Sequence, residues 1–318
     1  MKLKDIADII NQSTRIGISF HTSPDGDSLG SALALLIALK NIGKDSYILS
    51  KEILPSDFYF LPNSESIDGT IILPKEDTEV VIVLDCGNKE RINCDLSNYK
   101  GTIINIDHHL SNSSYGHINY IDTTAAAVAE IVFDLIKLLG ISLTKEIAEC
   151  LYTSIMTDTG SFKYSNTTSK THEIASELIS LSIDFSAIHR LVYDNRDFKY
   201  LKLLGKVYEE IQLINSSICL MKIPHSILKE LDYDLEDSSE IVSSGLTIKG
   251  VDIAILFKEV TGGIKISFRS KDKADVRKIA EPFGGGGHTK ASGAFIADIS
   301  IDTAIESVLK VLKDEKLC

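Results

Sequence analysis

Acidic and imidazole side chains recur in this chain at the points where hydrophobic runs end. A carboxylate that directly follows a run of buried residues is costly unless it is paired or bound to a metal. In an open α/β sheet, ligands and catalytic groups also lie at the carboxyl ends of the strands. Aspartate and histidine together form a ligand set for divalent cations. The segments concerned are His21–Asp27, Asp85, Asp107–His109, Asp122 and Asp158.

The hydrophobic runs predict a parallel sheet covered by helices in the N-terminal half. Runs rich in β-branched residues are typical of buried parallel strands, and here they alternate with Ala- and Leu-rich helical patterns. This alternation indicates βαβ units. Asp27 or Ser28 is the expected N-cap of the first of these helices. The predicted strands are 15–20, 79–84, 102–106 and 117–121, and the predicted helices are 28–40, 124–139 and 144–157.

The pattern changes after about residue 185, and we therefore expect two domains of the α/β class. Residues 1–185 would form the parallel-sheet domain, 186–211 a helical linker and 212–318 a smaller mixed α/β domain. We expect the active site in the cleft between the two domains. The predicted C-terminal strands are 217–223, 251–258 and 263–269, and the predicted helices are 224–231, 274–281 and 302–313.

The composition of the chain limits which substrates and binding partners are compatible with it. The 318 residues allow two domains with their own cores, and a formal net charge of −12 argues against tight binding to long duplex DNA. A small phosphorylated substrate stays compatible, since bound cations reverse the local charge of an acidic site. The five cysteines form no C-x-x-C pair, which indicates reduced thiols. Without a signal peptide or a membrane-length apolar run, the sequence predicts a cytoplasmic protein with no membrane partner.

Three candidate ligands share the turn that follows residue 20. Pro24 and Gly26 favour a turn that can aim His21, Asp25 and Asp27 at one point. The alternative is a polar turn that only caps the next helix.

Two single carboxylates stand at the ends of other elements. Asp85 follows four β-branched or aliphatic residues and precedes Cys86-Gly87, and Asp158 ends a helical pattern just before Gly160. An exposed loop aspartate and a polar helix-terminal turn are the alternatives for these two positions.

Adjacent histidines follow the strand 102–106 in the triplet Asp107-His108-His109. Neighbouring residues on an extended chain point to opposite sides, so one histidine can bind a metal while the other faces a substrate. Asp107 could then orient a histidine from behind. A surface triplet without function is the alternative.

The C-terminal half contains two candidate anion-binding features. The run Gly284–Gly287 before His288 offers backbone N–H groups that can surround an anion, although it could be a plain linker. Arg269 ends a strand pattern and could bind a phosphate through two hydrogen bonds, or it could be a solvated surface residue.

These segments together resemble the DHH phosphoesterase superfamily over nearly the whole chain. The resemblance rests on the opening His-Thr-Ser-Pro-Asp-Gly-Asp, on Asp-Cys-Gly, on Asp-His-His and on Met-Thr-Asp-Thr-Gly-Ser-Phe. The C-terminal Phe-Gly-Gly-Gly-Gly-His resembles the glycine-rich DHH-associated domain rather than the C-terminal domain of family II pyrophosphatases. Within the superfamily, the chain looks most like the nanoRNases, which degrade short oligoribonucleotides and dephosphorylate 3′-phosphoadenosine 5′-phosphate (pAp).

The resemblance implies a role for each matching residue. The implied cofactor is a pair of divalent cations, Mn²⁺ first with Mg²⁺ or Co²⁺ as alternatives, and Asp85 would bridge them. His109 would face the substrate phosphate, and Asp122, which has no role in the family's metal shell, would cap the helix 123–139. The first cation would bind His21 and Asp25, the second Asp27, His108 and Asp158, and the substrate would contact Arg269 together with Gly285, Gly286, Gly287 and His288.

The resemblance also implies the chemistry and the partners. Two cations about 3.5–4 Å apart would share a hydroxide and stabilise an in-line transition state. Short single-stranded RNA and small phosphorylated nucleotides would be substrates, and a homodimer is a family-level expectation. The alternatives are a phosphodiesterase for cyclic dinucleotides or their linear products (cyclic di-AMP, pApA), a RecJ-like single-strand exonuclease, and a non-catalytic nucleotide sensor.

Overall fold

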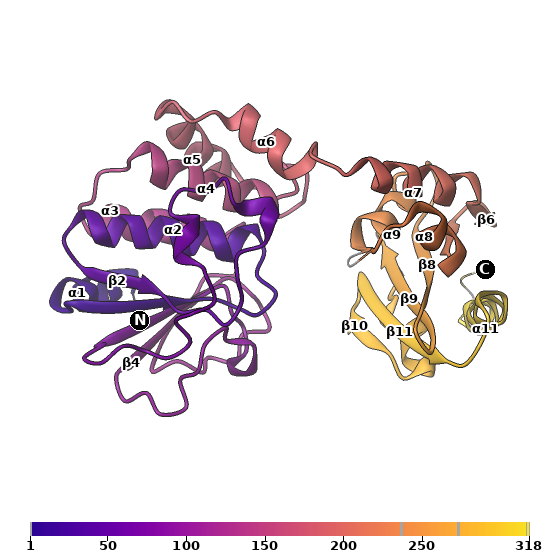
Figure 1. Cartoon of the computed structure of the whole chain (residues 1–318), viewed down its shortest axis with the longest axis horizontal. Helices are drawn as coiled ribbons and strands as arrows, with labels where there is room; N and C mark the ends of the chain where they lie inside the picture. Colours follow the sequence, from indigo (N-terminus) through magenta and orange to yellow (C-terminus); the bar gives the residue numbers. More distant parts are fainter. Residues whose placement is uncertain (1, 236–237, 272–273, 316, 318) are drawn as a thin grey trace. The chain divides into compact units, whose positions relative to one another are not determined.

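The computed structural model describes residues 2–235, 238–271, 274–315 and 317. The chain divides into two compact units, Met1–Asn195 and Arg196–Cys318. Each unit is built around a sheet of its own and has its own hydrophobic core (Figure 1). The predicted α/β class, with a parallel sheet first and a mixed sheet second, is confirmed.

The sheet of the first unit is parallel throughout, with the strand order β2-β1-β3-β4-β5. Its central strand β3 is a row of Val, Ile and Leu that is buried on both faces, as expected where helices cover a parallel sheet. Ile82 lies beside Ile18 on one side and Ile104 on the other, so these strands end at the same edge. The strands are β1 (Arg15–Ser19), β2 (Asp45–Ile48), β3 (Val80–Leu84), β4 (Thr102–Asp107) and β5 (Ile118–Ile121).

A close crossing of two helices determines where the first aspartates lie. Helix α2 is buried on almost every side because its sequence is largely Ala and Leu. At Gly30 it approaches α4 so closely that a Cβ atom would lie 2.5 Å from the carbonyl oxygen of Cys150. The helices of this unit are α1 (Leu3–Gln12), α2 (Gly26–Asn41), α3 (Val128–Leu138), α4 (Lys145–Asp158), α5 (Ser169–Ser180) and α6 (Phe185–Tyr193), with short 3₁₀ helices at Ser56–Phe58, Ser64–Ser66 and Lys89–Arg91.

The second unit has a six-stranded sheet in the order β10-β11-β9-β8-β7-β6. Only β7 and β8 pair in parallel; the other neighbours are antiparallel. One face packs against α11, and the other packs against α7, α8 and α9. The strands are β6 (Gln212–Ile214), β7 (Ile218–Ile223), β8 (Ile253–Val260), β9 (Gly263–Ser270), β10 (Gly286–His288) and β11 (Ala291–Ala297), and the helices are α7 (Phe198–Glu209), α8 (His225–Leu231), α9 (Ser239–Gly245), α10 (Arg277–Ala280), the 3₁₀ helix Glu281–Phe283 and α11 (Ile301–Asp314).

Two predicted helix starts are wrong. The N-cap of α2 is Asp25, whose side chain accepts a hydrogen bond from the Ser28 backbone N–H, and not Asp27 or Ser28 itself. Helix α3 begins only at Val128, so Asp122 does not cap it. Instead, the Asp122 carboxylate accepts hydrogen bonds from the backbone N–H and the hydroxyl of Thr124, at 3.0 and 2.6 Å, and closes a local turn.

The stretch 186–211, predicted as a helical linker, is mostly helical and consists of α6 and α7 with a break at 194–197. One C-terminal expectation is wrong. The glycine run is not an open loop of free N–H groups. The amides of Gly284 and Gly285 donate to the carbonyl groups of Glu281 and Ala280, and the next three residues form the edge strand β10.

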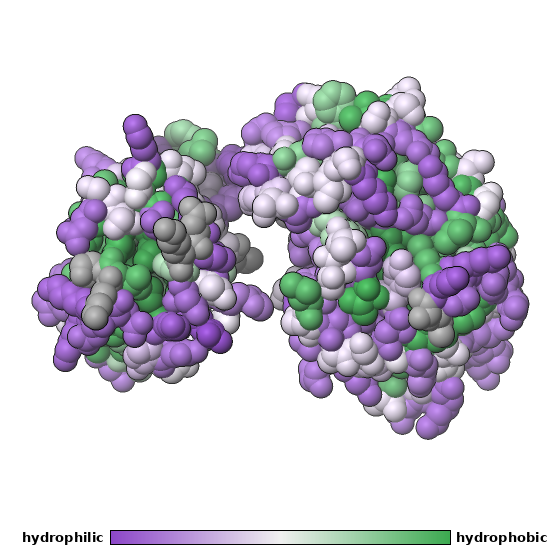
Figure 2. All heavy atoms as spheres, turned by 180° about the vertical axis from the view of Figure 1, so that it is seen from behind, coloured by the Kyte–Doolittle hydropathy of each residue, from purple (hydrophilic) through white to green (hydrophobic). Residues whose placement is uncertain are grey.

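The distribution of hydrophilic side chains and the burial of the cysteines are typical of a globular protein. Hydrophilic side chains cover much of both units in the view from behind, with smaller hydrophobic areas between them (Figure 2). Four of the cysteines predicted to be reduced are buried and free, namely Cys86, Cys94, Cys150 and Cys219, whereas Cys318 lies outside the described residues. None of the described helices is long and apolar enough to cross a membrane.

Candidate metal centre

The predicted acid and imidazole residues of the first unit come together at the carboxyl edge of its sheet. His21 follows β1, Asp85 follows β3, and the triplet Asp107–His109 ends β4. Asp27 lies in the first turn of α2, and Asp158 is the last residue of α4. Four segments of the sequence, His21–Asp27, Asp85, Asp107–His109 and Asp158, therefore supply one cluster, as expected for an open parallel sheet.

One half of the cluster is centred on His21. Its Nε2 atom lies 3.6 Å from an Asp25 carboxylate oxygen and 3.4 Å from Asp85 Oδ2. Its Nδ1 atom lies 2.9 Å from the carbonyl oxygen of Thr22, so Nδ1 is the donor and Nε2 faces the carboxylates. Burial opposes protonation, but the hydrogen bonds with Asp25 and Asp85 raise the pKa of His21 to about 10.

The other half is centred on His108. Its Nε2 atom lies 3.7 Å from Asp27 Oδ2, 3.7 Å from Asp85 Oδ1 and 3.6 Å from Asp158 Oδ2. Its Nδ1 atom contacts the carbonyl oxygen of Ala125 at 3.1 Å, which again turns Nε2 toward the carboxylates. Burial, and after it the charge of Asp27, raises the pKa of Asp158 to about 8.

Asp85 connects the two halves. One of its oxygens faces His21 and the other faces His108. Its side chain is 2% exposed, and Oδ1 has no hydrogen-bond partner among the described residues. Burial, followed by the nearby charge of Asp27, raises the pKa of Asp85 to about 7. Asp85 also adopts a left-handed backbone conformation with φ +53°, which is uncommon outside glycine.

The donor set fits divalent cations. The potential ligand atoms of His21, Asp25 and Asp85 lie within 4.8 Å of one another, and so do those of Asp27, His108 and Asp158. A buried carboxylate oxygen without a donor is costly, and a cation is the group that would satisfy it among carboxylates and imidazoles.

Asp27 is held by the start of a distant helix. Its Oδ2 atom accepts a 2.8 Å hydrogen bond from the Val128 N–H, the first residue of α3, which lies 101 residues further along the chain. Its Oδ1 atom accepts hydrogen bonds from the hydroxyls of Ser31 and Ser154 at 3.1 and 2.5 Å. Burial raises the pKa of Asp27, while His108 and these donors oppose the shift. The helix N-terminus therefore stabilises the carboxylate and fixes its direction.

A chain of hydrogen-bonded polar groups orients His109. The His109 Nδ1 atom lies 2.8 Å from Asp107 Oδ1, and this hydrogen bond raises the pKa of His109 to about 9. The other Asp107 oxygen accepts from the Asn112 amide at 2.5 Å, and that amide also donates to the Asn105 side chain at 2.8 Å. Burial opposes ionisation of Asp107, but the bonds from His109 and Asn112 lower its pKa.

The expectation that the two histidines point to opposite sides is wrong. The rings of His108 and His109 meet edge to face with centroids 4.7 Å apart, and both approach Asp85. The alternation of a strand no longer applies because β4 ends at Asp107. The rings differ instead in exposure, since the His108 side chain is 13% exposed and that of His109 is 44% exposed.

Sequence reasoning missed three neighbours of this cluster. Asn112 and Ser154 bind Asp107 and Asp27, and the Arg91 guanidinium lies 3.3 Å from His21 Nδ1. Asn112 is five residues after Asp107 and could have been found as a polar residue in the same turn. The other two have no local signal because folding alone brings them near the site.

The predicted anion-binding residues lie in the second unit. Arg269 is on β9, and its guanidinium donates to the Phe268 carbonyl at 3.0 Å and to the Ser239 hydroxyl at 3.4 Å. Its neighbour across the sheet is Ala291 of β11, which in turn pairs with His288 of β10. The sheet thus brings Arg269 into the same region as the glycine-rich strand.

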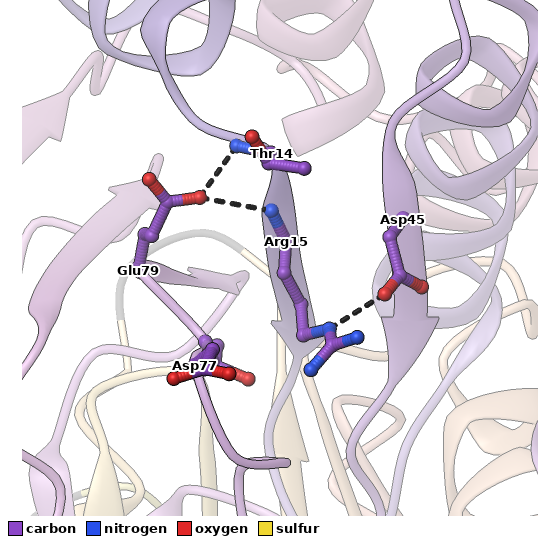
Figure 3. Close-up of a pocket in the computed structure, with 6 residues that line it drawn as sticks. Thr14, Arg15, Asp45, Asp77 and Glu79 are labelled. Atoms are coloured by element: carbon purple, nitrogen blue, oxygen red, sulfur yellow. Dashed lines mark hydrogen bonds and ion pairs between the residues drawn. The ribbon is translucent and has the colours of Figure 1, made fainter.

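A second charged region lies at the opposite, amino edge of the first sheet, beside a hollow of about 480 Å³ (Figure 3). Here Arg15 Nε contacts Asp45 at 2.5 Å. The Glu79 carboxylate accepts hydrogen bonds from the backbone N–H groups of Thr14 and Arg15 at 2.5 and 3.0 Å. Most of the charges in this hollow therefore have partners already, which is typical of a structural role.

Known proteins resemble the chain over its whole length. The profile of the DHH family, N-terminal domain, matches residues 15–155, and that of the DHHA1 domain matches 215–315. The bifunctional oligoribonuclease and PAP phosphatase NrnA of Thermus thermophilus is 32% identical over 99% of this chain and 94% of that protein. An exopolyphosphatase-related protein of Bacteroides fragilis has a TM-score of 0.89 and 30% identity over 99% of this chain and 96% of its own. RecJ of T. thermophilus, solved with Mn²⁺, shares the fold with a TM-score of 0.53 and 16% identity over 98% of this chain and 55% of its own.

Fold, site and relatives define an enzyme that hydrolyses phosphate esters, a phosphoesterase. Within that class, the chain belongs to the DHH family, and the histidines of its Asp107-His108-His109 triplet are part of the cluster of acids and histidines.

Proposed function

We propose that this phosphoesterase uses two divalent cations to degrade short oligoribonucleotides to mononucleotides and to dephosphorylate pAp. The observation that carries the two-metal part is Asp85, whose two buried oxygens face two different groups of ligands. The name of the T. thermophilus relative, which covers both activities, supports the substrates.

The side chains of the cluster would hold the cations. His21 and Asp25 would bind one, Asp27, His108 and Asp158 would bind the other, and Asp85 would contact both. Bound divalent cations supply a hydroxide at neutral pH and neutralise charge on the phosphoryl group. Mn²⁺ is our first choice because imidazole and carboxylate ligands are mixed at the site.

His109 would contact the substrate. Asp107 holds its Nδ1 atom, and the ring is half exposed, so Nε2 is left to donate to a phosphate oxygen. Asn112 holds Asp107 from behind and limits how far the ring can turn.

The second unit would bind the rest of the substrate. We assign catalysis to 1–185, substrate binding to 212–318 and the connection to 186–211. Arg269 and the segment Gly285–His288 would bind a phosphate, because a guanidinium and glycine backbone allow close approach to an anion.

Time courses of hydrolysis test this proposal. Purified protein would be incubated with pAp, RNA 2-mers to 5-mers, pApA and cyclic di-AMP, each with Mn²⁺ and with Mg²⁺. We expect fast turnover of pAp and the short RNAs and little turnover of cyclic di-AMP. A clear preference for pApA or cyclic di-AMP would replace the proposed substrates, and no turnover of any of them would overturn the proposed function.

A further inference from the structure

One face of the C-terminal sheet becomes progressively more exposed from β8 toward β10. On β8 this face carries Ala254 and Leu256, which are buried beneath helices α7, α8 and α9. On β9 it carries Arg269, Ser267 and Lys265, which alternate with buried residues of the core on the opposite face. Ser267 is half-buried and Lys265 is exposed, so the helices no longer cover this part of the sheet.

The strand register places an aromatic ring beside Lys265. Phe295 of β11 lies directly opposite Lys265, and residues paired in this way point to the same face. The Phe295 side chain is 49% exposed, which is unusual for a phenylalanine on a sheet. Gly293 is paired with Ser267, so only small residues stand between this pair and Arg269.

The charges of this face suit a polyanion. None of the residues that β8, β9, β10 and β11 direct to it is acidic, while Lys258, Lys265 and Arg269 are basic. Lys258 donates to the carbonyl of Leu235. Lys265 makes no hydrogen bond or ion pair with another described residue, so its ammonium group is available for a ligand.

The spacing along β9 is longer than one nucleotide. Arg269 and Lys265 are four residues apart on the strand, which corresponds to roughly 13 Å. A ligand that reaches from one to the other therefore has to be a chain of nucleotides. Exposed aromatic rings beside basic residues are the usual platform for unpaired bases.

We propose that Phe295 and Lys265 form a second binding position for single-stranded oligonucleotides on this face. Phe295 stacks on a base and Lys265 contacts a neighbouring phosphate, beyond the nucleotide bound near Arg269. The position rests on the proposed function, because it extends the same substrate. It serves oligonucleotides only, since pAp is too short to reach it.

Binding by the full-length chain tests the position without turnover. The probes are a fluorescein-labelled RNA 5-mer and pAp, both measured in EDTA. Phe295→Ala and Lys265→Ala should each weaken 5-mer binding by about 5- to 10-fold, near the lower end for one base–aromatic stack, and leave pAp binding unchanged. Phe295→Tyr should retain the wild-type affinity. A 2-aminopurine base in the 5-mer should be quenched by the wild type and by Phe295→Tyr but not by Phe295→Ala.

The chain offers a matched control on helix α7. Phe198 is 70% exposed, and the Lys202 ammonium lies 4.9 Å from its ring centroid, but this pair is on a helix rather than on the open sheet face. Phe198→Ala and Lys202→Ala should leave both affinities unchanged.

Three outcomes would overturn the position: unchanged 5-mer binding in Phe295→Ala, equal losses for the 5-mer and pAp, or no 5-mer binding by the wild type. Normal 5-mer binding without hydrolysis under Mn²⁺ would reject the proposed function and leave this position standing.

Discussion

Charged residues cluster at both edges of the N-terminal sheet, but the two clusters differ in burial and in whether their charges have partners. At the amino edge, Arg15 neutralises Asp45, and backbone N–H groups bind Glu79. These groups are exposed, and the hydrogen bonds from Arg15 and Thr14 lower the pKa of Glu79. At the carboxyl edge, Asp85 is buried with an oxygen that has no donor, and burial raises its pKa. The proposed metal site thus differs from the amino edge by buried charge that the described chain leaves unsatisfied, and not by the number of charged residues.

The largest expected difference between the edges is in catalysis. Asp85→Ala should lower kcat by on the order of 10³-fold or more, because it removes several kcal/mol of charge stabilisation at the reacting phosphate. Metal content, measured by mass spectrometry of the purified protein, should fall from two ions toward one or none. Glu79→Gln at the amino edge should keep normal turnover. Wild-type activity in Asp85→Ala would show that the catalytic site is not at the carboxyl edge.

The neighbouring histidines should separate metal binding from substrate contact. His108→Ala should lose one cation, because its Nε2 atom faces three carboxylates. His109→Ala should retain both cations and lose kcat, since it removes a contact to the transition state. Metal analysis that shows equal losses in the two variants would contradict this division, and the approach of His109 to Asp85 makes the test a sharp one.

A smaller loss of kcat is expected when Asn112, which supports Asp107, is replaced. Asn112→Leu removes the hydrogen bond to Asp107 but retains most of the volume, and it should lower kcat by about 10- to 100-fold, the usual effect of removing such a supporting partner. Metal content and KM should change little. Asn119 of β5 offers a control, because its side chain bonds only with Gly116 among the described residues. If Asn119→Leu lowers kcat as much as Asn112→Leu, the effect is one of general folding.

The raised pKa values predict a pH-dependent stability at the carboxyl edge. Asp85 and Asp158 titrate at about 7 and about 8 in the metal-free fold, compared with about 4 when unfolded. Their contribution to stability is present below pH ~4 and is lost as the pH rises to ~8. The Tm of EDTA-treated protein should therefore fall over this range, and Mn²⁺ should raise Tm more at pH 8 than at pH 5. Asp85→Asn should flatten both trends; an unchanged slope would show that buried carboxyls do not cause them.

The smallest change in stability is expected when the ion pair between Arg15 and Asp45 at the amino edge is broken. The Arg15 and Asp45 side chains are 34% and 47% exposed, so their ion pair is screened by water. Asp45→Asn should lower the midpoint of urea denaturation only slightly, because an exposed ion pair contributes little to stability, and turnover should stay normal. A loss of activity in this variant would mean that the two edges are coupled.

The sequence by itself determined β1, β3, β4 and β5 of the first sheet and the residues at their ends, whereas the edge strand β2 (Asp45–Ile48) was not predicted. Runs such as Val80–Leu84 specify a buried strand through side-chain shape alone, and the carboxylate that follows must then lie at the sheet edge. The Asp-His-His triplet was found in the same way. The first residues of the helices were harder to predict from the sequence. The N-cap of α2 and the late start of α3 depend on contacts with other parts of the fold.

Only the tertiary structure decided which polar groups meet. Asp27 binds the first N–H of α3 and the Ser154 hydroxyl, both more than a hundred residues away, because α2 crosses α4 at a glycine. The glycine run becomes an edge strand because β11 offers it unpaired backbone groups. Whether a buried carboxylate finds a donor depends on packing between distant segments, which local side-chain patterns do not encode.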